Sequence, residues 1–125
     1  MTSATYRIEV FHRISDPRCE VVRKKLAGLG FAISAVHISD NYLVNADIDE
    51  GQAIAVGRLL VQPVIQDFLV NRPYMPEGFD YAVEIGFLPG VTDNIAHTVR
   101  ESIEDLLKVP LDIEKSVFST ITYFF

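Results

Sequence analysis

The chain has 125 residues, enough for one domain with a sizeable core, and 49% of them are hydrophobic, which excludes wholesale disorder. Its 17 acidic residues against 11 basic ones give a formal net charge of -6, so the composition disfavours binding to nucleic acid or to an anionic membrane surface. The single cysteine, Cys19, cannot form an internal disulfide, and no run approaches the roughly 18 apolar residues of a membrane span. These features together predict a cytoplasmic protein.

Six elements are predicted in the first 71 residues. Asp16 and Pro17 are typical of a helix start, and Gly30 can take the left-handed conformation that ends a helix. The polar residues 39–41 between two apolar runs indicate the turn of a hairpin. In chain order we expect strand 5–13, helix 16–29, strands 33–38 and 42–46, helix 47–62 and strand 64–70. This βαββαβ order is the ferredoxin-like pattern, an α+β fold with an antiparallel sheet and the helices on one face.

A second, shorter set of elements follows. Residues 72–78 contain two prolines and a glycine and read as a connection. Beyond it we expect a βαβ unit with strand 79–87, helix 94–108 and strand 115–125. The predicted organisation is therefore a complete unit at 1–71, a linker at 72–78 and a partial second copy at 79–125.

The second unit repeats the first. Tyr6–Val10 is echoed by Tyr81–Ile85, and residues 36–44 can be laid on residues 117–125. The apolar positions of the two helices also correspond; they are Cys19, Val22, Leu26 and Leu29 in the first copy and Ala96, Val99, Ile103 and Leu106 in the second. A repeated unit predicts pseudo-symmetry, and a second copy without its other half suggests part of something larger.

The sequence predicts no catalytic, cofactor-binding or metal-binding residue. The three histidines, His12, His37 and His97, lack the spacing of a metal motif, and the helix phase places Cys19 among core positions rather than in a reactive site. Glu9 and Glu84 are equivalent in the two copies and could pair with Arg7 or with another sheet. A lone glutamate on each strand is weak evidence for acid–base chemistry.

One loop has features beyond its fold. Residues 87–95 join strand to helix through a Pro-Gly turn and a capping pair, and free amides at a helix start can also receive an anion. A tight turn and helix cap accounts for the same residues. We therefore name interface or anion-binding candidates here and in the apolar last strand: Pro89, Gly90, Thr92, Asp93, Asn94, His97 and Tyr123.

The assembled motifs resemble the PurS-like family, the small component of phosphoribosylformylglycinamidine (FGAM) synthase. The resemblance is carried by the opening strand Tyr6–Val10, the helix residues 21–30, the stretch 35–44 and the stretch 59–68, Leu-Leu-Val-Gln-Pro-Val-Ile-Gln-Asp-Phe. Residues 81–100 are similar to the stretch that follows the PurS-like unit in fused synthase chains. The resemblance thus covers nearly the whole chain, and it suggests the N-terminal portion of a fused synthase, a truncated form of one, or a small subunit with an extension.

The resemblance implies a non-catalytic, bridging role in de novo purine biosynthesis. The complete synthase is an ATP-dependent amidoligase that uses Mg and glutamine-derived ammonia, whereas this chain would hold no cofactor. Its partners would be the synthetase and glutaminase parts, with a homo-oligomer or an intramolecular pseudo-dimer as the form of the unit. The alternative is a ferredoxin-like regulatory module that senses a small metabolite. Turnover by the isolated chain, lost on substitution of Glu84 or His97, would instead indicate an independent enzyme.

Overall fold

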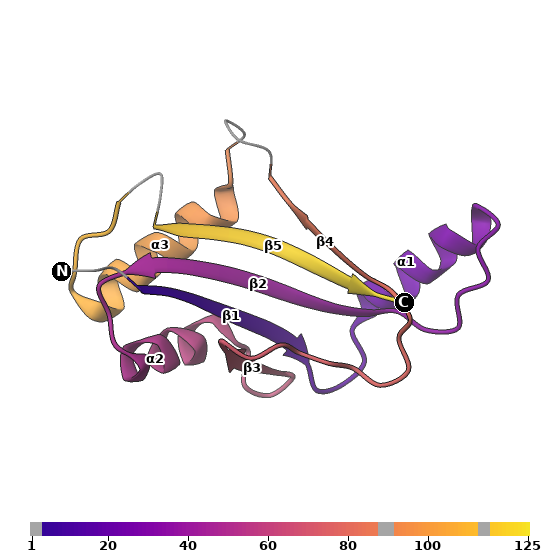
Figure 1. The fold of residues 1–125 in the computed structure, drawn as a ribbon, viewed down its shortest axis with the longest axis horizontal. Coiled ribbons are helices and arrows are strands. Elements are labelled where there is room, and N and C mark those ends of the chain that lie inside the picture. The colour runs from indigo at the N-terminus through magenta and orange to yellow at the C-terminus, as the bar shows by residue number, and fades with distance from the viewer. Residues whose placement is uncertain (1–3, 88–91, 113–115) are drawn as a thin grey trace.

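The computed structural model describes residues 4–87, 92–112 and 116–125. Within these residues, five strands form one antiparallel sheet in the order β3-β1-β2-β5-β4 and three helices accompany it (Figure 1), so the predicted α+β class is confirmed. The elements are β1 (Ala4–His12), α1 (Pro17–Gly28), β2 (His37–Ala46), α2 (Glu50–Leu60), β3 (Gln66–Val70), β4 (Ala82–Gly86), α3 (Asn94–Leu107) and β5 (Val117–Phe124).

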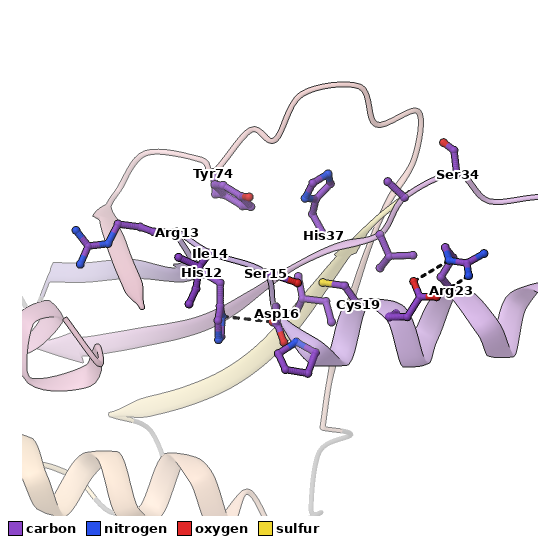
Figure 2. Close-up of a pocket in the computed structure, with 15 residues that line it drawn as sticks. His12, Arg13, Ile14, Ser15, Asp16, Cys19, Arg23, Ser34, His37 and Tyr74 are labelled. Carbon is purple, nitrogen blue, oxygen red and sulfur yellow. Dashed lines mark hydrogen bonds and ion pairs between the residues drawn. The ribbon is translucent and has the colours of Figure 1, made fainter. Parts of the chain in front are cut away.

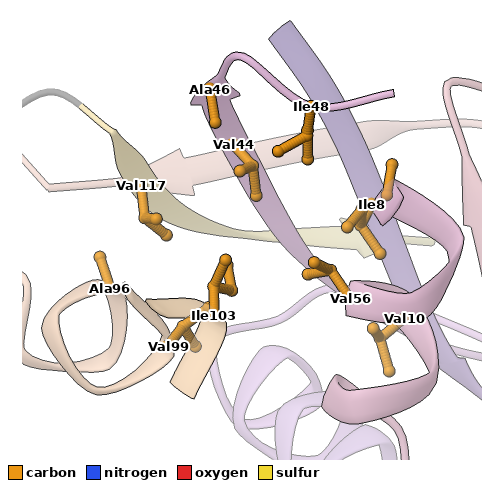
Figure 3. Packing of buried hydrophobic residues seen from close by; sticks show 11 residues of the cluster. Ile8, Val10, Val44, Ala46, Ile48, Val56, Ala96, Val99, Ile103 and Val117 are labelled. Carbon is orange, nitrogen blue, oxygen red and sulfur yellow. The ribbon is translucent and has the colours of Figure 1, made fainter. Parts of the chain in front are cut away.

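The core lies between one face of the sheet and the helices α2 and α3 (Figure 3). Alternate residues of a strand point to the same face, so Ile8 and Val10 of β1 both enter this core, where they are 0% and 2% exposed. The helices contribute residues three or four positions apart, which lie on one side of a helix. They are Ala53 and Val56 of α2 and Ala96, Val99 and Ile103 of α3.

Each helix begins at an aspartate that accepts a hydrogen bond from a backbone amide of the first turn. Asp16 caps α1 with Pro17 as the first helical residue, as the sequence predicts. Asp49 forms a capping box with Gln52 at the start of α2. Gly30 follows the end of α1 with a φ of +94°, the left-handed conformation expected there.

The predicted hairpin at residues 33–46 is wrong. Residues 37–46 form the single strand β2, which pairs with β1 on one side and β5 on the other. The polar residues expected in the turn lie inside this strand because hydrogen bonds satisfy them there: Ser39 donates to Asn41, and Asn41 donates to Thr122 of β5, at 2.8 Å each. The first unit therefore runs βαβαβ in this structure.

The first helix also departs from expectation. None of the twelve residues of α1, all of them described, is buried. Figure 1 shows α1 extending beyond the end of the sheet, whereas α2 and α3 lie along it. The prediction that the helices share one face therefore holds for α2 and α3 and is wrong for α1. Cys19, expected in the core, is only partly buried.

The strand pairing follows the sequence repeat. Tyr6 of β1 lies opposite Val44, and its counterpart Tyr81 exchanges backbone hydrogen bonds of 2.7 and 2.8 Å with Phe125, the counterpart of Val44. At the centre of the sheet β2 pairs with β5, and there Asp40 lies opposite Ile121, the residue that matches it in the repeat. The sheet thus has a local pseudo-two-fold axis between β2 and β5.

Candidate functional site

A cleft of about 520 Å³ opens where α1 leaves the sheet (Figure 2). Its volume lies within the range of small-molecule sites. The end of β1, the first turns of α1 and the start of β2 form it, and Tyr74 enters from the segment between β3 and β4, where its ring stacks on Phe11 at 4.2 Å. The polar side chains that line it are His12, Arg13, Ser15, Asp16, Glu20, Arg23, Ser34, His37 and Tyr74.

An ion-pair cluster holds the beginning of α1 in place. Arg18 binds Asp16 and reaches Asp40 of β2, at 2.8 Å each. Burial raises the pKa of Asp16, but the hydrogen bonds from Arg18 outweigh burial and bring the pKa below its usual value. The pKa of Arg18 is raised mainly by its bonds to Asp40 and Asp16. These charges therefore hold the first turn of α1 against β2.

The thiol in the cleft lacks the properties of a nucleophile. Burial raises the pKa of Cys19, and the negative charge of Asp16 raises it further, so the sulfur is protonated at neutral pH. His12 Nδ1 lies 3.4 Å from Asp16 Oδ2 and forms no hydrogen bond within the described residues. Cys19 is thus not prepared for thiol transfer.

The remaining lining groups favour negatively charged ligands. Glu20 is engaged by Arg23, and Asp16 by Arg18, so both carboxylates of the cleft are neutralised. Arg13, the two imidazoles and two serine hydroxyls remain as lining donors beside the amino end of α1. The cleft can therefore receive a small anion by charge and hydrogen bonding.

A second polar cluster crosses the sheet face opposite α2 and α3. Arg7 binds Glu9 at 2.8 Å and Glu84 of β4 at 2.9 Å, which confirms the pairing that the repeat suggested. Thr120 also donates to Glu84, and Asn41 donates to Thr120. Burial raises the pKa of Glu84, but the bonds from Arg7 and Thr120 outweigh burial and lower it. The cluster ties the two copies together, because Arg7 belongs to one and Glu84 to the other.

Among the residues named from the 87–95 loop, those that the structure describes lie apart from the cleft. Pro89 and Gly90 fall outside the described residues. Asp93 caps α3 by accepting from the Ala96 amide, and it also accepts from the backbone amide and hydroxyl of Ser119. Anion binding at this loop stays a prediction.

The other candidates lie on or near α3 and β5. Thr92, Asn94 and His97 are exposed around the first turn of α3. Tyr123 lines a shallow groove of about 160 Å³ together with Ile85, Phe87, Ile95 and Ile121. Tyr123 therefore lies at an apolar surface, whereas the side chain of His97 is exposed to solvent on α3.

Sequence analysis missed two contributors to the cleft. Tyr74 lies in the segment predicted as a linker, and the only available signal was an aromatic residue between two prolines. The link from Arg18 to Asp40 joins the first turn of α1 to β2, 22 positions further along the chain, so only the path of the chain could reveal it.

Neither metal ligation nor membrane insertion is indicated in the part of the chain that the structure describes. No three His, Cys, Asp or Glu residues gather there in a way that could hold a metal ion. No helix there is long and apolar enough to span a membrane.

We compared the chain with protein-family models, with curated proteins and with solved structures, and none of the three comparisons found a match. The function is therefore inferred from the sequence motifs and from the geometry described above.

Proposed function

We propose that this chain is a non-catalytic, PurS-like bridging part of FGAM synthase in de novo purine biosynthesis. In this role it organises the ATP-using synthetase and the glutaminase, and it works in the cytoplasm. ATP and Mg²⁺ belong to the synthetase part, and the chain holds neither. The first unit is then a variant of the ferredoxin-like fold in which one long strand replaces the hairpin.

The observation that carries the proposal is the pseudo-two-fold sheet. A bridge between two different partners needs two comparable surfaces held in fixed relation, and a repeat paired at its centre supplies them. The equivalent pairings of Tyr6 with Val44 and Tyr81 with Phe125 support such an internal pair. The contacts of Arg7 with Glu9 and Glu84 hold its halves together.

The chemistry of the cleft is consistent with a role other than catalysis. Its thiol has a raised pKa, and its carboxylates are engaged by arginines. The groups needed for nucleophilic attack or proton transfer would then come from the partners.

Reconstitution tests the proposal. The purified synthetase and glutaminase parts are assayed for FGAM formation with glutamine and, separately, with ammonium, each with and without this chain. A bridge raises the glutamine-dependent rate and leaves the ammonium-dependent rate nearly unchanged, because only glutamine use needs the two parts held together. An unchanged glutamine-dependent rate, with no ternary complex by sedimentation, contradicts the proposal.

The cleft favours one alternative, a metabolite-sensing regulatory module. Its volume of about 520 Å³ and the donors that line it, Arg13 and the two imidazoles among them, suit a small anionic metabolite. A thermal-shift screen separates the two functions: stabilisation by a nucleotide or amino acid alone supports the sensor, whereas stabilisation only by a synthetase or glutaminase partner supports the bridge.

A further inference from the structure

The outer edge of β3 is closed by its own chain. In an antiparallel pair, alternate residues direct their N–H and C=O groups toward the neighbouring strand, and the residues between them direct theirs away. The bonds that tie β3 to β1 leave the amides of residues 66, 68 and 70 pointing outward. Two of these amides are already bonded: Gln66 donates to the carbonyl of Gln62 and Phe68 to the carboxylate of Asp67, at 2.8 Å each. Such protection hinders an edge from pairing with another chain.

The outer edge of β4 lacks this protection among the described residues. Tyr81 and Phe125 exchange two backbone hydrogen bonds between the two strands. By the same alternation, Ala82, Glu84 and Gly86 direct their N–H and C=O groups away from β5. No described strand lies on that side, and β4 contains neither lysine nor proline, the residues that commonly guard an edge. The only charge on the strand, that of Glu84, is engaged across the sheet by an arginine of β1.

The repeat shows which place beside β4 is empty. Strands β1 and β4 are equivalent in the two copies, with Tyr6 matching Tyr81. Strand β1 has a partner on each side, β2 and β3, whereas within the described residues β4 has only β5. A strand added next to β4 would therefore give the second copy the arrangement that the first copy already has.

The side chains along this edge are apolar on one face. Val83, Ile85 and Phe87 alternate along the chain and are 44%, 56% and 52% exposed. Ile85 and Phe87 line the groove of about 160 Å³, and Val83 lies opposite Tyr123, which lines the same groove. Strand pairing at this edge would bury these side chains as well as satisfy the backbone groups.

The sequence of β4 is complementary to itself in one antiparallel register. With Ile85 on a two-fold axis, Val83 of one copy lies opposite Phe87 of the other, and Glu84 lies opposite Gly86. The apolar side chains then pair with one another, and each glutamate faces a glycine instead of a second carboxylate. Because the β3 edge is closed, β4 is expected to pair with β4, which gives a closed dimer, whereas pairing of β4 with β3 would continue from copy to copy.

We propose that two copies of this chain pair through β4, antiparallel about a two-fold axis at Ile85, and so join their five-stranded sheets into one. Each copy supplies the strand that the other lacks beside β4. This inference goes beyond the bridging function and does not depend on it, because its test reads association of the chain with itself.

Introduced cysteines test the register, in variants that all carry Cys19→Ser so that no native thiol reacts. Ile85→Cys places two cysteines opposite each other at a non-hydrogen-bonded pair, where Cα atoms about 4.5 Å apart allow a disulfide. Oxidation by diamide should therefore give a dimer on a non-reducing gel. Val83→Cys is the matched control: it should stay monomeric alone and form a dimer when mixed with Phe87→Cys. Absence of a link at Ile85→Cys, or a link of equal yield between two copies of Val83→Cys, overturns the proposal.

Sedimentation gives an independent readout. The unaltered chain should form a dimer that dissociates on dilution, and a monomer at concentrations up to about 100 µM overturns the proposal. Ile85→Lys sets two positive charges at the axis and should weaken dimerisation at least about tenfold. Val64→Lys, at a side chain 80% exposed at the turn before β3, should leave it within about twofold. Equal effects of the two substitutions also overturn the proposal.

Discussion

Helices α1 and α3 occupy equivalent places in a repeated β-α-β unit, yet α3 is part of the core and α1 is not. Both begin at a capping aspartate, and both carry an apolar stripe with the same spacing. The difference lies in what each aspartate and its neighbours bind. Asp93 binds Ser119 of β5 and holds α3 along the sheet, whereas Arg18 links Asp16 to Asp40 and holds the first turn of α1 against β2.

An apolar stripe indicates that a helix needs to pack against another surface. It does not determine which surface that is. Side chains at the first turn choose the direction of the helix, and the direction decides which apolar surface is within reach. For α3 that surface belongs to its own sheet, and for α1 it lies outside the chain's own core.

The largest expected difference comes from truncating matched stripe residues. Ile103→Ala removes a fully buried side chain and should lower the free energy of unfolding by about 2–5 kcal/mol. Leu26→Ala, at the equivalent position of α1, should change it by less than about 0.5 kcal/mol in the monomer. Urea denaturation at low protein concentration measures both. Equal losses would show that α1 is packed as α3 is.

A smaller difference is expected at the helix caps. Asp93→Ala removes the cap of α3 and the bonds to Ser119, and should cost about 1–2 kcal/mol of global stability. Asp16→Ala should instead unfold the first turn of α1 locally and affect global unfolding less, because the rest of the core does not depend on α1. Amide exchange resolved by peptide, together with urea midpoints, distinguishes the two; a global loss from Asp16→Ala as large as that from Asp93→Ala contradicts the comparison.

A modest gain should result from substitution of the last residue of α1. Nothing lies within 4 Å of a β-carbon added at Gly28, so Gly28→Ala should raise the helix content of α1 with a local gain of at most about 1 kcal/mol. The free energy of global unfolding should stay unchanged. Circular dichroism measures the helix content, and urea denaturation measures the free energy of global unfolding. If that free energy rises together with the helix content, α1 is coupled to the core.

The smallest effect on stability is expected at the ion pair between Arg7 and Glu84, which links the two copies of the repeat. The pKa of Glu84 in the folded chain lies below the usual value of 4.5, so its contribution to stability is present above that pH and is lost as the pH falls through the folded pKa. Because Glu84 is 40% exposed, the contribution is at most about 1 kcal/mol. Glu84→Gln should therefore lower the urea midpoint at pH 7 and make little difference at pH 3. A constant difference across this range would show that the charge of Glu84 is not responsible.

Periodicity and capping predict the elements of this fold better than they predict its contacts. The starts of α1 and α3 follow from Asp16 and Asp93, and the repeat predicts the pseudo-symmetry that the strand registers show. The hairpin prediction fails because Ser39 and Asn41 are polar, and a local pattern cannot show that they bond each other and Thr122 of the neighbouring strand β5. The cleft is missed because its walls, including Tyr74, come together only through tertiary contacts.

Nuclear Overhauser effects between strands test most directly whether β2 and β5 pair. The central claim is that the two copies share one sheet, with β2 and β5 paired about a pseudo-two-fold axis. We expect cross-strand effects that place Asp40 opposite Ile121. We also expect matching registers, with Tyr6 opposite Val44 and Tyr81 opposite Phe125. Cross-strand effects within β1–β2 and β4–β5 but none between β2 and β5 would contradict it.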